Sequence, residues 1–218
     1  MEELRILACS DLHNSARAAD MIAKLADSGD FDAVMIAGDF TTMGPVSFTR
    51  DFLSRIPIKV FAVPGNCDPL ETVEVLEDTN SSIHNMQAEF KGLRFFGFGG
   101  AVPGGGMPFE VEEDIIERSL RSVAAHGGVM LTHMPALGMN DLTRAGRHVG
   151  SEGILRVTNE FAPILHVSGH IHESRGRVIA AKTTFVNPGP SRHGNYASIR
   201  IGDVVEVELL REGELRPP

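Results

Sequence analysis

The stretch "LRILACSD" (residues 4–11) is an apolar run of strand length that ends in a polar residue. The next segment, "SARAADMIAKLADSG" (15–29), has the apolar spacing of an amphipathic helix, with Ser15 as the expected N-cap and Gly29 as the expected stop. The same order of strand and helix follows twice more, in "FDAVMIAGD" (31–39) with "PVSFTRDFLSRI" (45–56) and in "KVFAVPGN" (59–66) with "PLETVEVLED" (69–78). This alternation predicts an α/β fold with a parallel sheet built from crossover units.

The second half of the chain is richer in strands. "SIHNMQAEF" (82–90) and "LRFFGFGG" (93–100) flank "KG", a hairpin-turn pattern. Helices are expected over 111–125 and 152–161, a polar loop over 136–150, and further strands in "GGVMLTHMP" (127–135), "ILHVSGHIHES" (164–174), "GRVIAAKTTFVNPGP" (176–190) and "YASIRIGDVVEVELL" (196–210). Because no repeat, low-complexity tract or linker divides the chain, we expect a single domain over residues 1–218 with two sheets.

Composition excludes several classes of protein. The 218 residues are 42% hydrophobic and 22% charged, which is ordinary globular usage, and no apolar run approaches the roughly 20 residues of a membrane span. A net charge of −9, no tryptophan and one tyrosine argue against binding to extended nucleic acid. The N-terminus lacks a secretory pattern, and the two cysteines, Cys9 and Cys67, form no disulfide framework, so the expected location is the cytoplasm.

Polar residues stand where the predicted strands end. Asp11 and Asp39 lie 28 positions apart, and Asp39 and Asn66 lie 27 apart, close to the length of one crossover unit. In "GHIH", an extended chain would point His170 and His172 to the same face. The oxygen and nitrogen donors at the strand ends, which suit divalent metals, are Asp11, His13, Asp39, Asn66, Asp68, His133, His170 and His172. The carboxyl ends of parallel strands share one edge of a sheet, so we expect these groups to converge.

In that order, "DLH", "GDF", "GNCD", "LTHMP" and "GHIH" resemble the five signature blocks of the calcineurin-like metallophosphoesterases, over residues 11–172. The resemblance implies a two-sheet αββα sandwich and a dinuclear metal centre. It implies that one metal is held by Asp11, His13, Asp39 and His172, and the other by Asp39, Asn66, His133 and His170. Asp39 would then bridge the two metals.

Two divalent ions about 4 Å apart can clamp the attacking and leaving oxygens of a phosphoryl displacement, with a bridging hydroxide as the nucleophile. The mixture of carboxylate, amide and imidazole donors suits Mn, Fe, Zn, Ni or Co better than an all-oxygen Mg site. Two divalent ions are expected, with Mn first and the other four as alternatives. A site that is locally positive in an acidic protein suits a small phosphoester.

The third block departs from the commoner pattern, because Cys67 stands where the family usually carries a histidine. A thiol can donate a proton but stabilises negative charge less well than an imidazolium. The resemblance therefore narrows to the small prokaryotic GNCD branch, and the first expectation is a phosphodiesterase acting on a cyclic nucleotide or a nucleotide diester. A phosphomonoesterase is the alternative, and a non-catalytic metal-binding scaffold is a third interpretation. The expected catalytic residues are Asn66, Cys67 and Asp68, although Cys67 as a small filler and Asp68 as a helix cap in "DPLE" are competing interpretations.

Five residues near the expected rim are candidates for substrate contact: Arg144, Arg147, His148, Arg192 and His193. For each of them, a solvated loop charge is the competing interpretation. His84, His126 and His166 are assigned to structure or surface. The oligomeric state is open, and the strand-rich C-terminal segment offers an edge for a homodimer.

Overall fold

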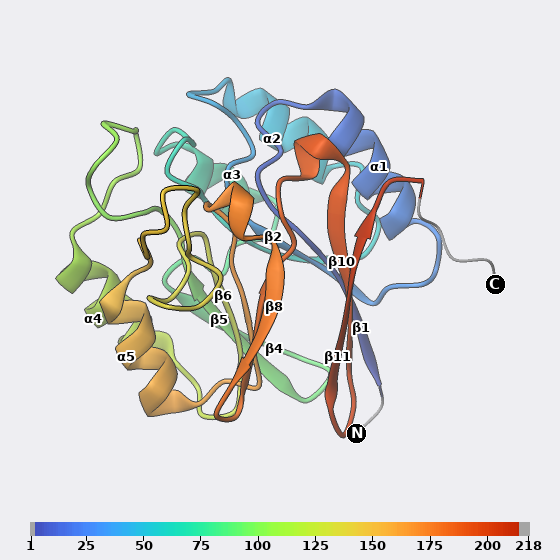
Figure 1. Cartoon of the computed structure of the whole chain (residues 1–218). Helices are drawn as coiled ribbons and strands as arrows, with labels where there is room; N and C mark the ends of the chain where they lie inside the picture. The colour runs from blue at the N-terminus through green and yellow to red at the C-terminus, as the bar shows by residue number, and fades with distance from the viewer. Residues whose placement is uncertain (1–2, 214–218) are drawn as a thin grey trace.

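Two β-sheets lie face to face in the computed structural model, which describes residues 3–213, and helices cover the outer face of each sheet (Figure 1). This is the αββα sandwich that the family resemblance implies. The expected domain of residues 1–218 also includes residues 1–2 and 214–218, which lie outside the described part of the chain.

The first sheet has the strand order β11-β10-β1-β2-β3. Its strands are β1 (Leu4–Cys9), β2 (Ala33–Ala37), β3 (Lys59–Val63), β10 (Asn195–Ile201) and β11 (Val205–Arg211). β1, β2 and β3 are parallel, as the strand–helix alternation predicts, and β10 pairs antiparallel with both β1 and β11. The helices that alternate with β1, β2 and β3 in the N-terminal half of the chain are α1 (Ala16–Ala26), α2 (Val46–Leu53) and α3 (Thr72–Asp78).

The second sheet has the order β4-β5-β6-β7-β9-β8. Its strands are β4 (Met86–Phe90), β5 (Leu93–Phe98), β6 (Val129–Thr132), β7 (Leu165–Val167), β8 (Gly176–Ala180) and β9 (Thr183–Asn187). The four central strands are parallel, and β4 and β8 are antiparallel edge strands. Helices α4 (Glu113–Val123) and α5 (Glu152–Phe161) lie over its outer face (Figure 1).

Alternation along the strands builds the layers. In β1, Leu4 and Ile6 face the core between the two sheets, whereas Leu7 and Cys9 face the core beneath α1 and α2. Phe61 of β3 stacks on Phe95 of β5 with ring centroids 4.1 Å apart, which joins the sheets. Because both faces of each parallel strand are buried, nearly every residue of these strands is apolar, which explains the continuous apolar runs in the sequence.

The predicted boundaries of α1 are nearly correct. Ser15 caps the helix as expected, because its side chain accepts a hydrogen bond from the backbone N–H of Ala18. The helix ends at Ala26 with Asp27 as its C-cap, and Gly29 follows in the left-handed conformation, two residues beyond. The "KG" turn between β4 and β5 is also confirmed, with Lys91 and Gly92 both at positive φ.

The "GHIH" segment departs from the extended conformation expected from the sequence. β7 ends at Val167, His170 has a φ of 66°, and His172 begins a short 3₁₀ helix, η1 (His172–Ser174). The two histidines are therefore loop residues, and their side chains make separate contacts. The loop is held in this shape by the Gly169 N–H, which donates to the His133 carbonyl oxygen, and by the Asn187 side-chain amide, which donates to the Ile171 carbonyl oxygen.

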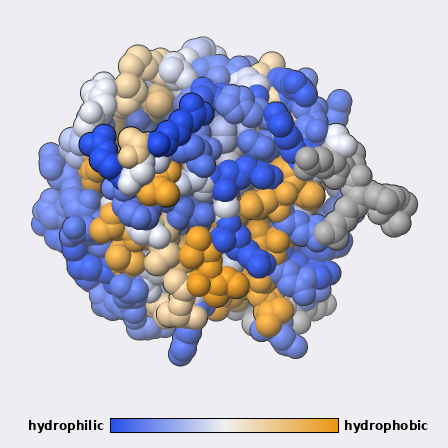
Figure 2. Space-filling view, in the orientation of Figure 1, coloured by the Kyte–Doolittle hydropathy of each residue, from blue (hydrophilic) through white to orange (hydrophobic). Residues whose placement is uncertain are grey.

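Apolar side chains are also exposed on the surface. Figure 2 shows apolar surface in the lower centre of the view, where Figure 1 places β8 and β11, and the exposed apolar residues of this region include Val178, Ile179 and Val204.

Among residues 3–213, no helix has both the length and the apolar character needed to cross a membrane.

Candidate metal centre

Seven of the eight donor residues expected at the strand ends, those that the family resemblance assigns to the metals, meet at the carboxyl edges of the two sheets. Each lies in the loop after a parallel strand, namely Asp11 and His13 after β1, Asp39 after β2, Asn66 after β3, His133 after β6, and His170 and His172 after β7. The sequence therefore predicted their convergence correctly, because parallel strands in both sheets end at one edge of the sandwich.

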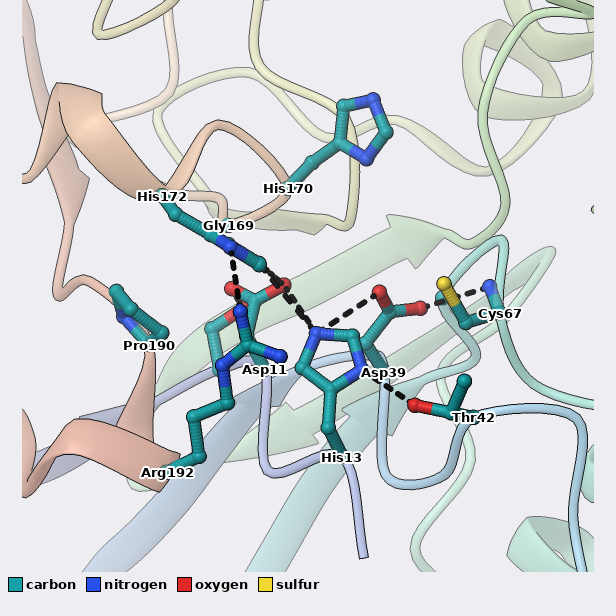
Figure 3. A network of polar contacts seen from close by, with 12 residues as sticks. Asp11, His13, Asp39, Thr42, Cys67, Gly169, His170, His172, Pro190 and Arg192 are labelled. Atoms are coloured by element: carbon teal, nitrogen blue, oxygen red, sulfur yellow. Dashed lines mark hydrogen bonds and ion pairs between the residues drawn. The ribbon is translucent and has the colours of Figure 1, made fainter. Parts of the chain in front are cut away.

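Asp11, His13 and His172 form the first group of donors (Figure 3). The Nε2 atom of His172 lies 3.1 Å from Oδ1 of Asp11 and 3.4 Å from Nε2 of His13. Nε2 of His13 lies 3.6 Å from Oδ2 of Asp39. Four donors from three loops thus face one small space.

Asn66, His133 and His170 form the second group. The Nε2 atom of His133 lies 2.8 Å from Oδ1 of Asn66 and 3.2 Å from Nδ1 of His170. It also lies 3.6 Å from Oδ1 of Asp39. Asp39 therefore presents one carboxylate oxygen to each group and stands between them.

The hydrogen bonds of His133 show that this arrangement suits a cation. Nδ1 of His133 lies 2.7 Å from the carbonyl oxygen of Ala37, which can only accept, so Nδ1 carries the proton. In the neutral ring, Nε2 then presents a lone pair to the oxygens of Asn66 and Asp39. Burial lowers the pKa of His133, but the carboxylates of Asp39 and Asp11 outweigh it and raise the pKa above its usual value. The fully buried ring thus lies where positive charge is favoured, and the donor set fits a divalent metal.

The backbone of the centre is held in uncommon conformations. Asp11, His13, Asp39 and His170 all have φ between 47° and 66°, in the left-handed region that non-glycine residues rarely adopt. Such local strain persists only where the surrounding structure fixes it, and it is characteristic of functional sites.

Close approach of the loops depends on glycine. A Cβ at Gly169 would overlap Oγ of Ser10, so the loop after β7 reaches β1 only without a side chain there. Ser10 itself donates a 2.5 Å hydrogen bond to Oδ2 of Asp11. Sequence reasoning missed Ser10 and also Thr42, whose Oγ1 lies 3.0 Å from Nδ1 of His13. Ser10 directly precedes the motif residue Asp11, and Thr42 follows the motif residue Asp39 by three positions. This closeness in sequence to a motif aspartate is the one signal that could have identified them.

Asp68 does not cap α3, so that interpretation of "DPLE" is wrong. The residue before α3 is Glu71, and no side chain caps the helix. The fully buried Asp68 carboxylate instead accepts hydrogen bonds from the backbone N–H groups of Phe40, Thr41 and Gly65, and from the Thr41 hydroxyl. Burial and the nearby Asp39 raise the pKa of Asp68 to about 7. Its role here is to tie the loop after Asp39 to the loop after β3.

Cys67 lies against Asp39. Its backbone N–H donates to Oδ1 of Asp39 at 2.9 Å, and Figure 3 shows its sulfur directed toward the same carboxylate. Burial, with the Asp39 charge, raises the pKa of the Cys67 thiol well above its ordinary value. Met107, from the loop between β5 and α4, places its sulfur 4.0 Å from that of Cys67.

Of the five candidate substrate contacts, Arg192 is the one that touches the donor cluster. Its guanidinium Nη2 lies 3.3 Å from Nδ1 of His172 (Figure 3), and its backbone N–H donates to the Asp11 carbonyl oxygen. His193 is its exposed neighbour in the 3₁₀ helix η2 (Ser191–His193). Arg192 is exposed, so its guanidinium is accessible to a ligand that arrives from solvent.

The other three candidates lie on the exposed loop between β6 and α5. The backbone N–H of Arg144 donates to Glu173, beside His172. Arg147 and His148 make contacts within the loop, and Nδ1 of His148 lies 2.6 Å from the buried carboxylate of Asp141. The loop packs on η1, but these contacts do not bring the three side chains to the donor cluster.

The expectation for the remaining histidines agrees with the structure. His166 is fully buried beside Thr132, with Nε2 2.7 Å from the hydroxyl, and burial lowers its pKa to about 3. His84 accepts a hydrogen bond from the Gly99 N–H, and burial lowers its pKa to about 4. His126 is exposed.

Taken together, the fold and site define a class of α/β sandwich proteins that carry clustered metal donors at the shared edge of two sheets. The model of the calcineurin-like phosphoesterase family matches residues 4–174. The chain belongs to this family, which confirms the superfamily indicated by the five sequence blocks and supports phosphoric ester hydrolysis with divalent metals.

Relatives and solved structures extend the likeness over nearly the whole chain. Uncharacterized protein MJ1162 of Methanocaldococcus jannaschii is 28% identical over 88% of this chain and 91% of its own length. TT1561 of Thermus thermophilus has a similar fold, with a TM-score of 0.76 and 16% identity over 95% of this chain and 98% of its own. A novel archaeal phosphodiesterase has a TM-score of 0.56 and 16% identity over 95% of this chain and 100% of its own. Small prokaryotic proteins thus share the fold.

Proposed function

We propose that the chain is a dinuclear metal-dependent phosphodiesterase that hydrolyses a small phosphodiester, such as a cyclic nucleotide or a nucleotide diester. The observation that carries the proposal is the position of Asp39, whose two carboxylate oxygens face two separate groups of donors. In this proposal Asp11, His13 and His172 hold one ion with Asp39, and Asn66, His133 and His170 hold the other. When bound, two such ions supply Lewis-acid charge to the phosphoryl group and acidify the attacking water.

The protein's own contribution is to fix the donors before substrate arrives. The Ala37 carbonyl orients the ring of His133, and Thr42 contacts that of His13. Such partners set the tautomer and direction of a ligating imidazole. Asp68 holds the loop after Asp39 in place and so supports the positions of His13 and His133. Asp68 is therefore a positioning residue.

The preference for diesters rests on charge. Cys67 replaces the usual histidine beside Asp39, so a cationic imidazolium is missing where the phosphoryl group would lie. A doubly charged monoester loses more from that absence than a singly charged diester. The shared fold of the archaeal phosphodiesterase and the GNCD block are consistent with this branch.

A phosphomonoesterase is the second candidate, and Arg192 favours it. The exposed guanidinium beside His172 adds a permanent positive charge, and a guanidinium can bind two phosphate oxygens at once. A scaffold without catalysis is disfavoured, because family members that have lost catalysis lack metal ligands, whereas all seven donor positions are filled here.

Several finer expectations remain part of the proposal. Manganese is the first ion to test, because the carboxylate and amide oxygens of Asp11, Asp39 and Asn66 suit it. The acidic net charge supports a small phosphoester over extended nucleic acid as the partner. We further propose one metallophosphoesterase domain working in the cytoplasm, with a homodimer left open.

The test begins with the full chain stripped by a chelator and reloaded with Mn, Ni, Zn or Mg singly. Hydrolysis of bis(4-nitrophenyl) phosphate and 4-nitrophenyl phosphate is then compared, with Asp39→Asn as the blank. Diester turnover that requires added metal and vanishes in the blank supports the proposal. Faster cleavage of the monoester would make the second candidate the function. Metal bound without turnover of either ester would favour the scaffold.

A further inference from the structure

The Cys67 thiol lies within reach of a metal held by neighbouring residues. A ligand atom of His13, a carboxylate oxygen of Asp39 and Sγ of Cys67 all lie within 4.8 Å of one another. The three residues come from the loops after β1, β2 and β3, so three separate segments place a nitrogen, an oxygen and a sulfur around one point. Metal–sulfur bonds of about 2.3 Å and metal–nitrogen bonds of about 2.0 Å require donor atoms closer than about 4.3 Å, so small side-chain movements bring all three donors onto one ion.

A second observation shows that a cation belongs beside Asp39. The fully buried His133 directs the unprotonated Nε2 of its neutral ring at oxygen atoms of Asn66 and Asp39, and two acceptors face each other there at 2.8 Å. That contact does not involve Cys67. It indicates a positive ion next to the carboxylate against which the thiol lies.

We infer that Cys67 is a sulfur ligand to the metal held by His13 and Asp39, and that it biases this position toward soft divalent ions such as Zn²⁺ or Cd²⁺. The inference rests on the metal centre of the proposed function and adds a donor to it. On binding, one metal–sulfur bond forms and the S–H bond breaks, with the proton leaving to solvent. This role differs from the proton donor expected from the sequence.

The consequences concern both metal choice and substrate charge. Thiolate ligands select Zn²⁺ and related ions over Mn²⁺, which prefers oxygen donors. A bound thiolate also removes one unit of positive charge from the centre. This agrees with a singly charged diester as substrate, because the centre would then attract a dianion less strongly.

The experiment uses cobalt(II), which absorbs strongly in the near ultraviolet when a thiolate is bound. Stripped full-length protein is titrated with Co²⁺ while metal content is measured on the same samples. We expect the sulfur-to-cobalt band in the wild type and its loss in Cys67→Ser, with the number of cobalt ions bound unchanged. Cys9→Ala is the matched control, because Cys9 is the other cysteine and is buried in the core beneath α1 and α2; it should keep the band.

Competition between ions gives a second readout. Cys67→Ser should weaken Zn²⁺ binding by roughly tenfold and change Mn²⁺ binding by less than about twofold. Cobalt bound by the wild type without the band, or a band that persists in Cys67→Ser, would overturn the inference and leave the proposed function standing. Failure to bind any divalent ion would instead overturn the proposed function, and the inference with it.

Discussion

Nε2 of His133 lies 2.8 Å from Oδ1 of Asn66, although in the neutral ring both atoms carry lone pairs. The Ala37 carbonyl fixes the ring proton on Nδ1, so the contact cannot be relieved by a change of tautomer. Two buried acceptors held together in this way are destabilising unless a metal ion, or a proton on Nε2, offsets their repulsion. The relationship therefore links the folding of the centre to metal binding.

Metal removal should lower stability for this reason. A ligand that binds only the folded state adds about 2.7 kcal/mol at a hundredfold excess over its dissociation constant. We expect chelated protein to unfold at a lower temperature than protein loaded with Mn²⁺ or Zn²⁺, as measured by calorimetry. His133→Ala should lose most of this gain, whereas equal melting temperatures with and without metal would contradict the assignment.

Replacing Asp68 with asparagine should destabilise the fold. An amide oxygen cannot accept all four hydrogen bonds that the carboxylate accepts, and the amide N–H₂ would face backbone donors. We expect a loss of about 2–4 kcal/mol in the free energy of unfolding, measured with denaturant. Asp51→Asn, at an exposed position of α2, is the control. If Asp68→Asn loses no more than this control, the four hydrogen bonds do not hold the loops.

His166 should make stability depend on pH. Burial lowers its pKa to about 3 in the folded protein, against about 6.5 in the unfolded chain. The unfolded chain therefore binds the proton first, so the stabilisation is complete above pH 6.5 and declines as pH falls toward 3. At pH 5 the loss is about 2 kcal/mol.

The variant His166→Gln should reduce the difference in unfolding free energy between pH 7.5 and pH 5 by about that amount. Denaturant titrations of the stripped protein at both pH values measure it. His126→Gln, at an exposed position, is the matched control. The same pH difference in His166→Gln as in the wild type would show that this ring does not stay neutral in the core.

Arg192 should matter more for monoesters than for diesters. Its guanidinium lies beside His172 at the rim of the centre, and a charge-assisted hydrogen bond to phosphate is worth about 1.5–3 kcal/mol. Arg192→Ala should therefore raise KM for a phosphomonoester roughly tenfold or more, with a smaller effect on a diester. Steady-state kinetics of both esters test this, with Arg118→Ala on the exposed side of α4 as the control. Unchanged KM for both esters would remove Arg192 from the substrate site.

Gly169→Ala should damage the centre without replacing a donor, because its Cβ would lie 2.8 Å from Oδ2 of Asp11. The added methyl group would overlap Ser10, which hydrogen-bonds Asp11, so the His170–His172 loop must move away from β1. We expect metal affinity to fall roughly 10–100-fold, as when other supports of metal ligands are lost. Gly202→Ala adds the same group where nothing lies within 4 Å and should bind metal normally. Normal metal binding by both variants would contradict the close packing described.

The order of elements and the position of the donors follow from the sequence itself. Apolar runs of strand length that alternate with amphipathic helices indicate a parallel sheet covered by helices, and the resemblance of the five sequence blocks implies the αββα sandwich that the structure shows. Parallel strands also bring their carboxyl ends together, and Asp11, Asp39 and Asn66 were foreseen at one edge for that reason. These are consequences of local pattern and chain direction.

Only the tertiary structure decided how the side chains are used. Asp68 matches a capping pattern locally, yet its carboxylate joins two loops that are distant in sequence. His170 and His172 leave the extended conformation in a loop whose Ile171 carbonyl oxygen accepts a hydrogen bond from the distant Asn187 side chain. The approach of Cys67 to His13 and Asp39 depends on three loops packing at once. Local pattern fixes which residues reach the edge of a sheet, whereas contacts between loops depend on the whole fold.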